Sequence, residues 1–388
     1  MNQYQEKQLN LNLAMISLPN KREKRIVFVG GGSVGHVAPL LAVMQEVNTQ
    51  HPEIKLIYIG TQADLESPLL TSSKLPIETH AIEAGKINRF VTIKHLSELR
   101  KLCLGLLQAQ VLLEKIQPDL VFAKGAYVSV PVVLAAALRA IPIYTHETDV
   151  VPGLANRLSS HFAQTIFTAF PIDCYTSLPK QKLLYMGQPV RKEFLKHSTA
   201  RMFNDLSLSD PLITVTGGSL GSRSINALIS EGWSSLLPYT QLAHLCGEAD
   251  FNMLTKKAGQ LPAELRKKLL LTPFVTHGLP DLFQHSQVVV SRAGGTIAEL
   301  AACGASTILI PLPTAAQNHQ WANARVLMAA EAVEVCDELT MSSENLVKEI
   351  LALQNDSARR VALSNAIHKF AKPNAAEEMA ILICSRIE

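Results

Sequence analysis

Arg25-Ile-Val-Phe-Val-Gly-Gly-Gly-Ser-Val-Gly-His36 is the stretch from which the fold of this chain can be predicted. It begins as an apolar run, passes through a turn rich in glycine, and is followed by the helix-like sequence Val37-Ala-Pro-Leu-Leu-Ala-Val-Met44. Gly30, Gly32 and Gly35 fit the pattern G-x-G-x-x-G, in which missing side chains let the backbone approach a ligand at the start of a helix. The stretch therefore predicts a buried strand, a tight turn that can bind an anion, and a helix.

Two further glycine turns follow in the second half of the chain. Thr214-Val-Thr-Gly-Gly-Ser-Leu-Gly221 and Val288-Val-Val-Ser-Arg-Ala-Gly-Gly295 each join a strand-like run to a helical pattern. The chain has 388 residues, which is too long for one ordinary core. It fits two domains of about 150 to 200 residues each. The repeated turn predicts two nucleotide-binding-like domains that face one cleft.

Short apolar segments alternate with helical stretches in both halves of the chain, a pattern typical of parallel sheets with helices on both faces. Ligands of such sheets bind at the carboxyl ends of the strands, where these glycine turns lie. We expect a flexible N-terminal extension over 1–24, an N-terminal domain over 25–197, a linker over 198–211 and a C-terminal domain over 212–371. The expected strands are 26–29, 55–59, 120–123, 141–144, 212–216, 242–245, 269–271, 288–291, 307–310 and 333–335.

The composition argues against several classes of protein. A formal net charge of +3, with no long basic tract interleaved with aromatic residues, argues against a nucleic-acid partner. The six cysteines are scattered without a C-x-x-C pair, so neither a zinc site nor a disulfide framework is indicated. The longest apolar stretch, 128–143, is interrupted by Pro131, Arg139 and Pro142 and falls short of the roughly 20 residues that span a bilayer. Any contact with a membrane is therefore expected at its surface.

Further motifs follow the first glycine turn in a defined order: Phe122-Ala-Lys-Gly-Ala-Tyr-Val-Ser129, His146-Glu147, Gly187-Gln-Pro-Val-Arg191, Gly217-Gly-Ser-Leu-Gly221, Ser291-Arg-Ala-Gly294 and Asn318-His-Gln320. Together with the first turn they resemble the MurG family (glycosyltransferase family 28), which are UDP-N-acetylglucosamine:lipid I N-acetylglucosaminyltransferases. Several motifs in one order are more specific than any single glycine loop. The resemblance runs from about Arg25 to the C-terminus.

This resemblance implies an α/β fold of the GT-B type, in which two Rossmann-like domains with parallel sheets face a central cleft. A helix at about 372–388 would cross back onto the N-terminal domain. The implied activity is that of an inverting hexosyltransferase of peptidoglycan synthesis, which moves N-acetylglucosamine from UDP to the C4 hydroxyl of the muramyl sugar. The implied partners are UDP-N-acetylglucosamine, the muramyl peptide linked to undecaprenyl pyrophosphate, and the anionic surface on the cytoplasmic face of the inner membrane.

No Asp-x-Asp pair occurs in the sequence, so we expect no metal and no cofactor. Helix N-termini and backbone N–H groups would then stabilise the negative charge of the departing UDP.

Roles for individual residues follow from the resemblance, motif by motif. His36 is expected to be the general base or to position the acceptor, because an imidazole with a near-neutral pKa suits proton transfer. Glu299 would accept hydrogen bonds from the ribose hydroxyls, Arg191 would contact uridine or phosphate, and His319 and Gln320 would bind the donor sugar. The other expected donor-site residues are Ser33, Gly35, Asp149, Gly218, Ser219, Val275, Gly294, Gly295 and Thr296. The expected acceptor-site residues are Gly31, Gly32, Gly125, Tyr127, His146 and Glu147.

Three positions depart from the family pattern. Asp149 replaces an asparagine of some members, and an ionised carboxylate can only accept hydrogen bonds, so the sugar contact there is expected to differ. Ala126 replaces a glycine before Tyr127, and Leu220 replaces a glutamine that would contact sugar or phosphate.

The segment 86–115 mixes apolar and basic residues, which suits an anionic membrane surface. A helix with one face in the core and a solvated basic face is the alternative interpretation. Other functions also stay open. A GT-B UDP-N-acetylglucosamine 2-epimerase would need no lipid, and a non-catalytic nucleotide-sugar-binding protein would need no acceptor. A dinucleotide-dependent oxidoreductase accounts only for the first glycine turn.

Overall fold

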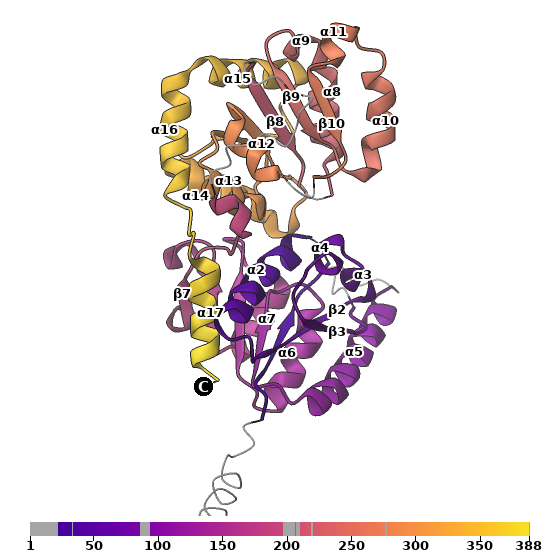
Figure 1. Ribbon diagram of the computed structural model, residues 1–388, viewed down its shortest axis with the longest axis vertical. Helices are drawn as coiled ribbons and strands as arrows, with labels where there is room; N and C mark the ends of the chain where they lie inside the picture. The colour runs from indigo at the N-terminus through magenta and orange to yellow at the C-terminus, as the bar shows by residue number, and fades with distance from the viewer. Residues whose placement is uncertain are drawn as a thin grey trace, which may run out of the picture.

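A computed structural model describes residues 22–32, 34–85, 94–196, 206, 210–218, 220–275 and 278–387, and excludes the side chains of residues 34 and 94–96. Within this part of the chain, two parallel sheets with their helices are stacked along the long axis of the molecule (Figure 1). The expected N-terminal extension lies almost wholly outside the described residues, as does most of the expected linker.

The N-terminal sheet has seven parallel strands in the order β3-β2-β1-β4-β5-β6-β7. Because the order reverses between β1 and β4, the connections on either side leave in opposite directions and a crevice opens at the carboxyl ends of these strands. The strands are β1 (Arg25–Val29), β2 (Lys55–Gly60), β3 (Ile77–Ala81), β4 (Leu120–Ala123), β5 (Ile143–Glu147), β6 (Thr165–Thr168) and β7 (Leu183–Tyr185).

The C-terminal sheet has six parallel strands in the order β10-β9-β8-β11-β12-β13, and its order reverses between β8 and β11. The second crevice therefore opens after the strands that carry the other two glycine turns. The strands are β8 (Leu212–Thr216), β9 (Gln241–Leu245), β10 (Leu269–Thr272), β11 (Val288–Ser291), β12 (Thr307–Leu309) and β13 (Glu334–Val335).

Helices cover both faces of each sheet, so β1, β8 and β11 are almost completely buried. The helices of the first half are α2 (Val34–Gln50), α3 (Gln62–Leu65), α4 (Pro68–Thr71), α5 (Lys94–Ile116), α6 (Ser129–Leu138) and α7 (Leu154–Phe162). Those of the second half are α8 (Arg223–Glu231), α9 (Trp233–Leu236), α10 (Glu248–Ala258), α11 (Ala263–Arg266), α12 (Leu279–His285), α13 (Thr296–Cys303), α14 (His319–Ala329), α15 (Ser343–Asn355), α16 (Ser357–His368) and α17 (Ala375–Ser385). Short 3-10 turns are η1 (Ile172–Cys174), η2 (Lys180–Lys182), η3 (Lys192–Leu195) and η4 (Ala316–Asn318).

The predicted strands agree with the structure best in the sheet centres, where β4, β8 and β11 have the expected bounds. The strands β3, β6 and β7 were missed. β3 and β7 lie at the two edges of the sheet and are less buried, so their apolar signal is weak. After β2 the chain forms two short helices, α3 and α4, because Pro68 starts a new helix.

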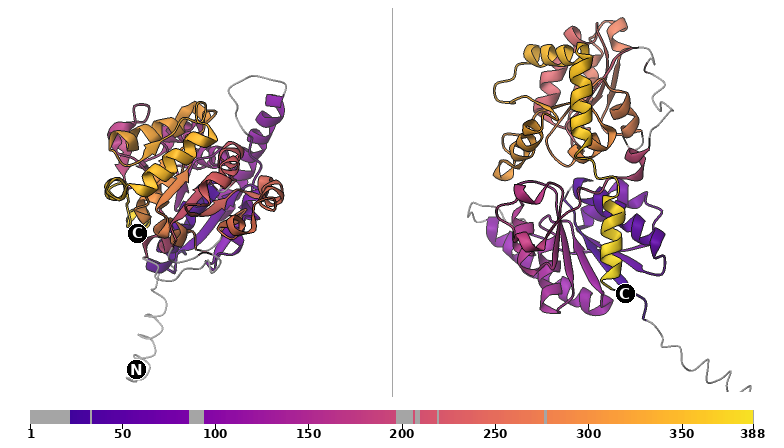
Figure 2. Two further views of the ribbon diagram at one scale, coloured as in Figure 1. Left: turned by 90° about the horizontal axis from the view of Figure 1, so that it is seen from above. Right: turned by 90° about the vertical axis from the view of Figure 1, so that its left-hand side faces the viewer.

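Helix α17 returns from the C-terminal half and lies on the N-terminal domain, beside α2 (Figures 1 and 2). Met379, Ala380 and Ile383 are fully buried there, in one cluster with Phe28 and Leu40. The last turn is held by Lys24, whose Nζ donates to the carbonyl oxygen of residue 387. The chain thus crosses between the two halves twice, once near 187–191 and once near 371–374.

We predict that Ile383→Ala lowers the free energy of unfolding by about 2 to 5 kcal/mol, because it leaves a cavity between α17 and the N-terminal sheet. Ile381 is the matched control: it lies on the same helix but its side chain is 50% exposed, whereas Ile383 is 0% exposed. Ile381→Ala is expected to cost less than about 1 kcal/mol. Chemical denaturation followed by circular dichroism measures both, and equal losses would contradict the docking of α17.

Candidate active site

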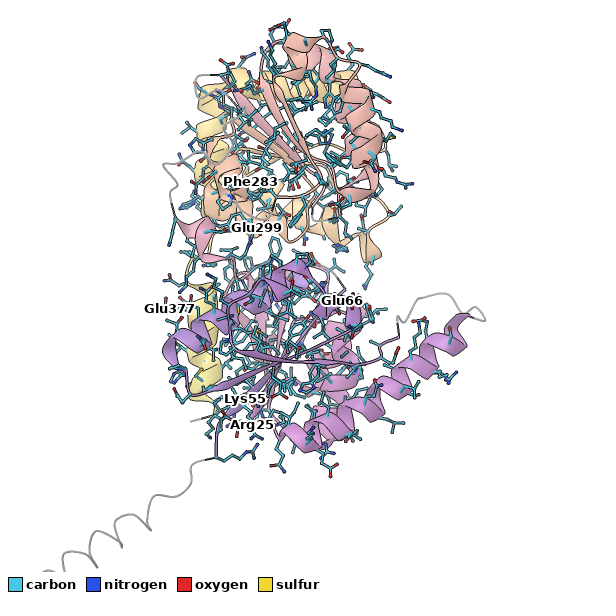
Figure 3. All side chains as sticks on the ribbon, turned by 45° about the vertical axis from the view of Figure 1, so that its right-hand side comes forward. Arg25, Lys55, Glu66, Phe283, Glu299 and Glu377 are labelled. Carbon is cyan, nitrogen blue, oxygen red and sulfur yellow. The ribbon has the colours of Figure 1, made fainter. Side chains whose placement is uncertain are left out.

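A cavity of about 590 Å³ lies between the two halves, and both contribute to its wall. This volume is within the range of small-molecule sites. The N-terminal half supplies the start of α2, and the C-terminal half supplies the turns after β8, β10 and β11. Figure 3 labels Glu299 and Phe283, two lining residues, on the side of the upper domain that faces the lower one.

Of the expected donor-site residues, those that line this cavity are Gly35, Arg191, Gly218, Val275, Gly294, Gly295, Thr296, Glu299 and Gln320. The structure thus brings together residues from five motifs that are up to 285 positions apart, from Gly35 to Gln320. His36, Asp149 and His319 do not line the cavity, and neither do the six expected acceptor-site residues. Ser33 and Ser219 lie outside the described residues.

Glu299 lies in the first turn of α13, where its carboxylate faces the cavity. Loss of hydration raises the pKa of Glu299 to about 7, and the nearby positive charge of Arg191 opposes the rise. Arg191 itself is held: its Nη1 lies 2.7 Å from Glu193 Oε1, and its guanidinium stacks 5.2 Å from the centre of the Phe194 ring. The two side chains place a carboxylate and a fixed cation at one end of the cavity.

The β8–α8 and β11–α13 turns bring two helix N-termini to the cavity. The first N–H groups of a helix have no partner within the helix and favour an anion there. The structure requires glycine at Gly221, because its φ is +75° and a Cβ would lie 2.2 Å from the carbonyl oxygen of Cys246. The N–H of Gly218 is less available than expected, since it donates to Thr216 Oγ1 at 3.1 Å.

The two residues expected to bind the donor sugar are separated by the structure. Gln320 lines the cavity, and its Oε1 accepts a hydrogen bond of 2.9 Å from the backbone N–H of Leu312. This bond leaves the Gln320 amide nitrogen close to Gly294. His319 instead donates from Nδ1 to the carbonyl oxygen of Ala316 at 2.8 Å.

A second polar cluster lies under the first glycine turn, with Lys124 at its centre. The sequence motifs predicted no role for Lys124. The Lys124 side chain is 1% exposed, with Nζ 2.6 Å from His146 Nδ1, and it also donates to Thr148 Oγ1. His146 donates from Nε2 to the carbonyl oxygen of Gly187 at 2.9 Å, so its Nδ1 is the acceptor for Lys124. Burial lowers the pKa of Lys124 to about 7, although Glu147 and Asp149 oppose the shift.

His36 is half-buried beside this cluster. The near-neutral pKa expected for it is wrong: burial and the positive charge of Lys124 lower the pKa of His36 to about 4, with Asp149 and Asp64 opposing. The sequence around His36 could not predict its low pKa, because Lys124 follows a different strand, β4. His36 is therefore neutral at physiological pH.

Asp64 stabilises the first glycine turn, a role that the sequence motifs did not predict. Its Oδ1 accepts from Gly32 N at 2.6 Å, while its Oδ2 accepts from the N–H and hydroxyl of Thr61 at 2.8 and 2.6 Å. A Cβ on Gly31 would lie 2.1 Å from the Asp64 carboxylate, so a larger residue there would displace the carboxylate from these hydrogen bonds. The capping-box pattern Thr61-x-x-Asp64 is the signal that could have identified it.

The acceptor-site residues lie around this turn rather than in the cavity wall. Glu147 is buried, and its carboxylate accepts hydrogen bonds from Asp149 N at 2.9 Å and from Asn156 Nδ2 at 2.8 Å. These bonds stabilise the loop that follows β5. Tyr127 lies over Gly32, whose Cβ would be 3.2 Å from the Tyr127 ring. Gly125 has a φ of +83°.

The structure explains two of the three departures from the family pattern and locates the third. Ala126 has a φ of +62°, a left-handed conformation that glycine adopts at lower cost, which accounts for the family's glycine. Asp149 Oδ1 accepts from Asn323 Nδ2 at 2.8 Å, so the carboxylate is engaged by the other domain. Leu220 is 76% exposed and lines the cavity as an apolar side chain.

Asn323 connects the two halves. Its Oδ1 accepts from the backbone N–H of Val150 at 2.9 Å, and its Nδ2 donates to Asp149 and, at 3.0 Å, to the carbonyl oxygen of Ala293. Gln188 makes a second connection by donating to the carbonyl oxygen of Gly295 at 3.2 Å. Gln188 thus contacts the turn that starts α13 directly, and Asn323 of α14 links Asp149 and Val150 to the same turn through Ala293.

Two parallel-sheet α/β domains that enclose one cavity at the carboxyl ends of their strands have the architecture of a GT-B glycosyltransferase. Residues 26–168 match the model of the glycosyltransferase family 28 N-terminal domain, and residues 212–379 match that of the C-terminal domain. The chain therefore belongs to glycosyltransferase family 28.

Individual relatives agree with this assignment. A Bacillus cereus protein named UDP-N-acetylglucosamine–N-acetylmuramyl-(pentapeptide) pyrophosphoryl-undecaprenol N-acetylglucosamine transferase 2 is 35% identical, over 88% of this chain and 94% of its own length. The transferase of that name from Thermodesulfovibrio yellowstonii is 33% identical, over 92% and 96%. The crystal structure of Acinetobacter baumannii MurG has 25% identity and a TM-score of 0.68, over 93% of this chain and 99% of that one.

A UDP-N-acetylglucosamine 2-epimerase from Neisseria meningitidis has nearly the same TM-score, 0.67, but only 16% identity. This likeness shows a shared fold and nothing more. No group of three or more His, Cys, Asp or Glu side chains that could hold a metal ion occurs in the described part of the chain.

We predict a pH-dependent difference in stability between the wild type and Lys124→Met. The pKa of Lys124 is lowered from 10.5 to about 7 in the folded state, so the unfolded chain binds more protons between these two pH values. The stability of the folded protein therefore rises with pH over this range. Methionine has a similar length and does not titrate. The free energy of unfolding of the wild type minus that of the variant should therefore rise from pH 7.5 to 9.5. A difference that stays constant or falls would show that Lys124 is not held in a low-dielectric site.

Proposed function

We propose that this protein is an inverting hexosyltransferase that moves N-acetylglucosamine from UDP-N-acetylglucosamine to the C4 hydroxyl of the muramyl sugar on an undecaprenyl-pyrophosphate carrier. The observation that carries the proposal is the cavity between the two sheets, in which Glu299 and the N-termini of α8 and α13 converge. Family 28 membership and relatives named for this transfer along nearly the whole chain support it.

The donor would bind mainly to the C-terminal domain, over 212–371. Uracil would lie against the backbone near Val275, and Glu299 would accept hydrogen bonds from the ribose hydroxyls. The sugar would contact Gln320, whose amide nitrogen is oriented by the Leu312 hydrogen bond. An amide suits a neutral sugar because it both donates and accepts.

The diphosphate would lie between the starts of α8 and α13, where Gly294, Gly295 and Thr296 line the cavity. Helix dipoles and unpaired N–H groups would stabilise the charge that develops as the bond to UDP breaks. This arrangement requires no metal ion, because the backbone already supplies fixed positive potential.

The acceptor would approach from the N-terminal domain, over 25–197, to which α17 contributes. His36 would take the proton from the C4 hydroxyl, since it is neutral at physiological pH. The negative charge of the bound diphosphates would raise the low pKa of His36 and so favour proton transfer. Asp64 and Tyr127 hold the glycine turn through which the acceptor would be positioned.

The test is release of UDP from UDP-N-acetylglucosamine, with and without a short-chain lipid I analogue, in the presence of a metal chelator. We expect release that depends on the acceptor and survives chelation. Epimerised sugar without acceptor-dependent release would instead identify the epimerase. UDP-sugar binding with neither product would identify a non-catalytic binder.

Two variants separate the proposed roles in this assay. Glu299→Ala should raise KM for the donor about tenfold or more, since one or two hydrogen bonds to a charged group are lost. His36→Ala should lower kcat by about 100-fold or more while leaving the affinity for UDP nearly unchanged. The reverse pattern would contradict both assignments.

We also propose that the protein contacts the anionic cytoplasmic face of the inner membrane through helix α5. This helix projects from the side of the N-terminal domain (Figure 3). Leu104, Leu107 and Val111 are exposed at helical spacing on it, with Arg100 and Lys101 one turn earlier. Exposed apolar and cationic side chains on one helix favour such a surface. Residues 86–93, the rest of the expected segment, lie outside the described residues. Within the part of the chain that the structure describes, no helix is both long and apolar enough to cross a bilayer.

Vesicle sedimentation tests the membrane proposal. Val111→Glu should weaken binding to vesicles with anionic phospholipid several-fold, because it places a negative charge on the exposed stripe. Val361→Glu is the matched control, since Val361 is similarly exposed, at 60% against 70% for Val111, but lies on α16 of the other domain. Equal binding by both variants, or no binding by the wild type, would contradict a role for α5.

A further inference from the structure

Arg292 lies directly after the central strand β11 and lines the cavity next to the turn that starts α13. A guanidinium at this place could in principle bind the donor diphosphate directly. The structure gives its guanidinium other partners. The residue is 7% exposed, and both of its terminal nitrogens are engaged within the C-terminal domain.

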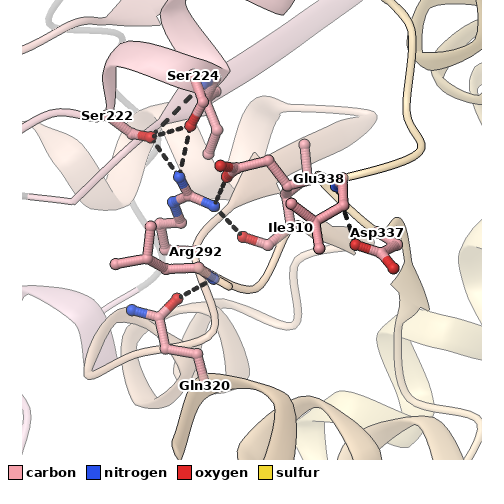
Figure 4. A network of polar contacts seen from close by, with 10 residues as sticks. Ser222, Ser224, Arg292, Ile310, Gln320, Asp337 and Glu338 are labelled. Atoms are coloured by element: carbon pink, nitrogen blue, oxygen red, sulfur yellow. Dashed lines mark hydrogen bonds and ion pairs between the residues drawn. The ribbon is translucent and has the colours of Figure 1, made fainter. Parts of the chain in front are cut away.

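Four acceptors surround these two nitrogens (Figure 4). Nη2 donates to Ser222 Oγ at 2.6 Å and to Ser224 Oγ at 2.8 Å. Nη1 donates to the carbonyl oxygen of Ile310 at 2.9 Å and pairs with the carboxylate of Glu338. The Glu338 side chain is itself mostly buried, so this ion pair is poorly screened by solvent and offsets the positive charge of Arg292.

The two serines belong to the start of α8. Ser222 is the N-cap, whose Oγ accepts from the N–H of Ile225, and it immediately follows the glycine turn after β8. A Cβ on Gly217 would lie 2.3 Å from Ser222 N, so the turn and the cap are packed tightly against each other. A shift of Ser222 would therefore shift the turn.

We propose that Arg292 is a positioning residue that fixes the β8–α8 turn, through Ser222 and Ser224, in the conformation that binds the donor diphosphate. It ties the start of α8 to the ends of β11 and β12 and to Glu338. The diphosphate is then bound by backbone N–H groups of a turn held in place, and Arg292 does not contact it. This inference rests on the proposed function, since it takes the occupant of the turn to be the diphosphate of UDP.

The test compares the dissociation constants of UDP and of uridine, which lacks the diphosphate, by isothermal titration calorimetry. Ser222→Ala/Ser224→Ala separates Arg292 from α8 and leaves its charge in place. We expect this double variant to weaken UDP binding about tenfold, as for the loss of a hydrogen bond to a charged group, and uridine binding less than twofold. Arg292→Lys should weaken UDP binding by the same factor, because an ammonium group cannot hold four acceptors in a planar arrangement.

Adding Arg292→Lys to the double variant should cause no further loss, because all three changes break one connection. Ser342→Ala is the control for the loss of a helix cap: Ser342 caps α15, accepts from Asn345 N at 3.2 Å, and is not among the residues that line the cavity. It should leave UDP affinity unchanged.

A direct phosphate contact by Arg292 makes the opposite prediction. The double serine variant would then bind UDP as well as or better than the wild type, and Arg292→Lys would keep most of the affinity. Either result overturns the positioning role. Failure of the wild type to bind UDP would instead overturn the proposed function, so the two failures are distinguishable.

Discussion

The position at which each sheet reverses its strand order is the constraint on which the rest of the structure depends. At β1 and β4, and again at β8 and β11, successive connections leave the sheet on opposite faces, so the carboxyl ends of the strands stay uncovered. Only short turns fit between a buried strand and the helix that packs on it. Glycine is required where the backbone of such a turn meets the backbone of another segment, as Gly221 meets Cys246. The cavity is the space that these two reversals leave between them.

Loss of hydration sets the charge states both in the cavity wall and in the polar cluster under the first glycine turn. The same loss of water raises the pKa of Glu299 and lowers the pKa values of His36 and Lys124, because burial disfavours whichever form is charged. The unliganded site therefore contains fewer full charges than its residue types suggest. A ligand with a diphosphate changes that balance, so the proton affinity of His36 is coupled to what is bound beside it.

Polar contacts link the two domains near the site, beside an apolar cluster that continues from one domain into the other. Asn323 bonds to Asp149 and Val150, and Gln188 bonds to Gly295. All of them end near the start of α13, which also lines the donor cavity. The acceptor-side loop at 147–150 is thus linked by hydrogen bonds to the turn proposed to hold the diphosphate.

The sequence by itself determined the fold class, the central strands and the glycine turns, because buried strands and left-handed turns depend on local composition. It also predicted that glycine turns of both halves face one cleft, since ligands of parallel sheets bind at the carboxyl ends of the strands. The tertiary structure decided what those residues do there. The low pKa of His36 depends on Lys124, the engagement of Asp149 depends on Asn323, and the partners of Arg292 lie 18 to 70 positions away. Electrostatic and hydrogen-bonding environments are sums over neighbours in space, and most of those neighbours are distant in the chain.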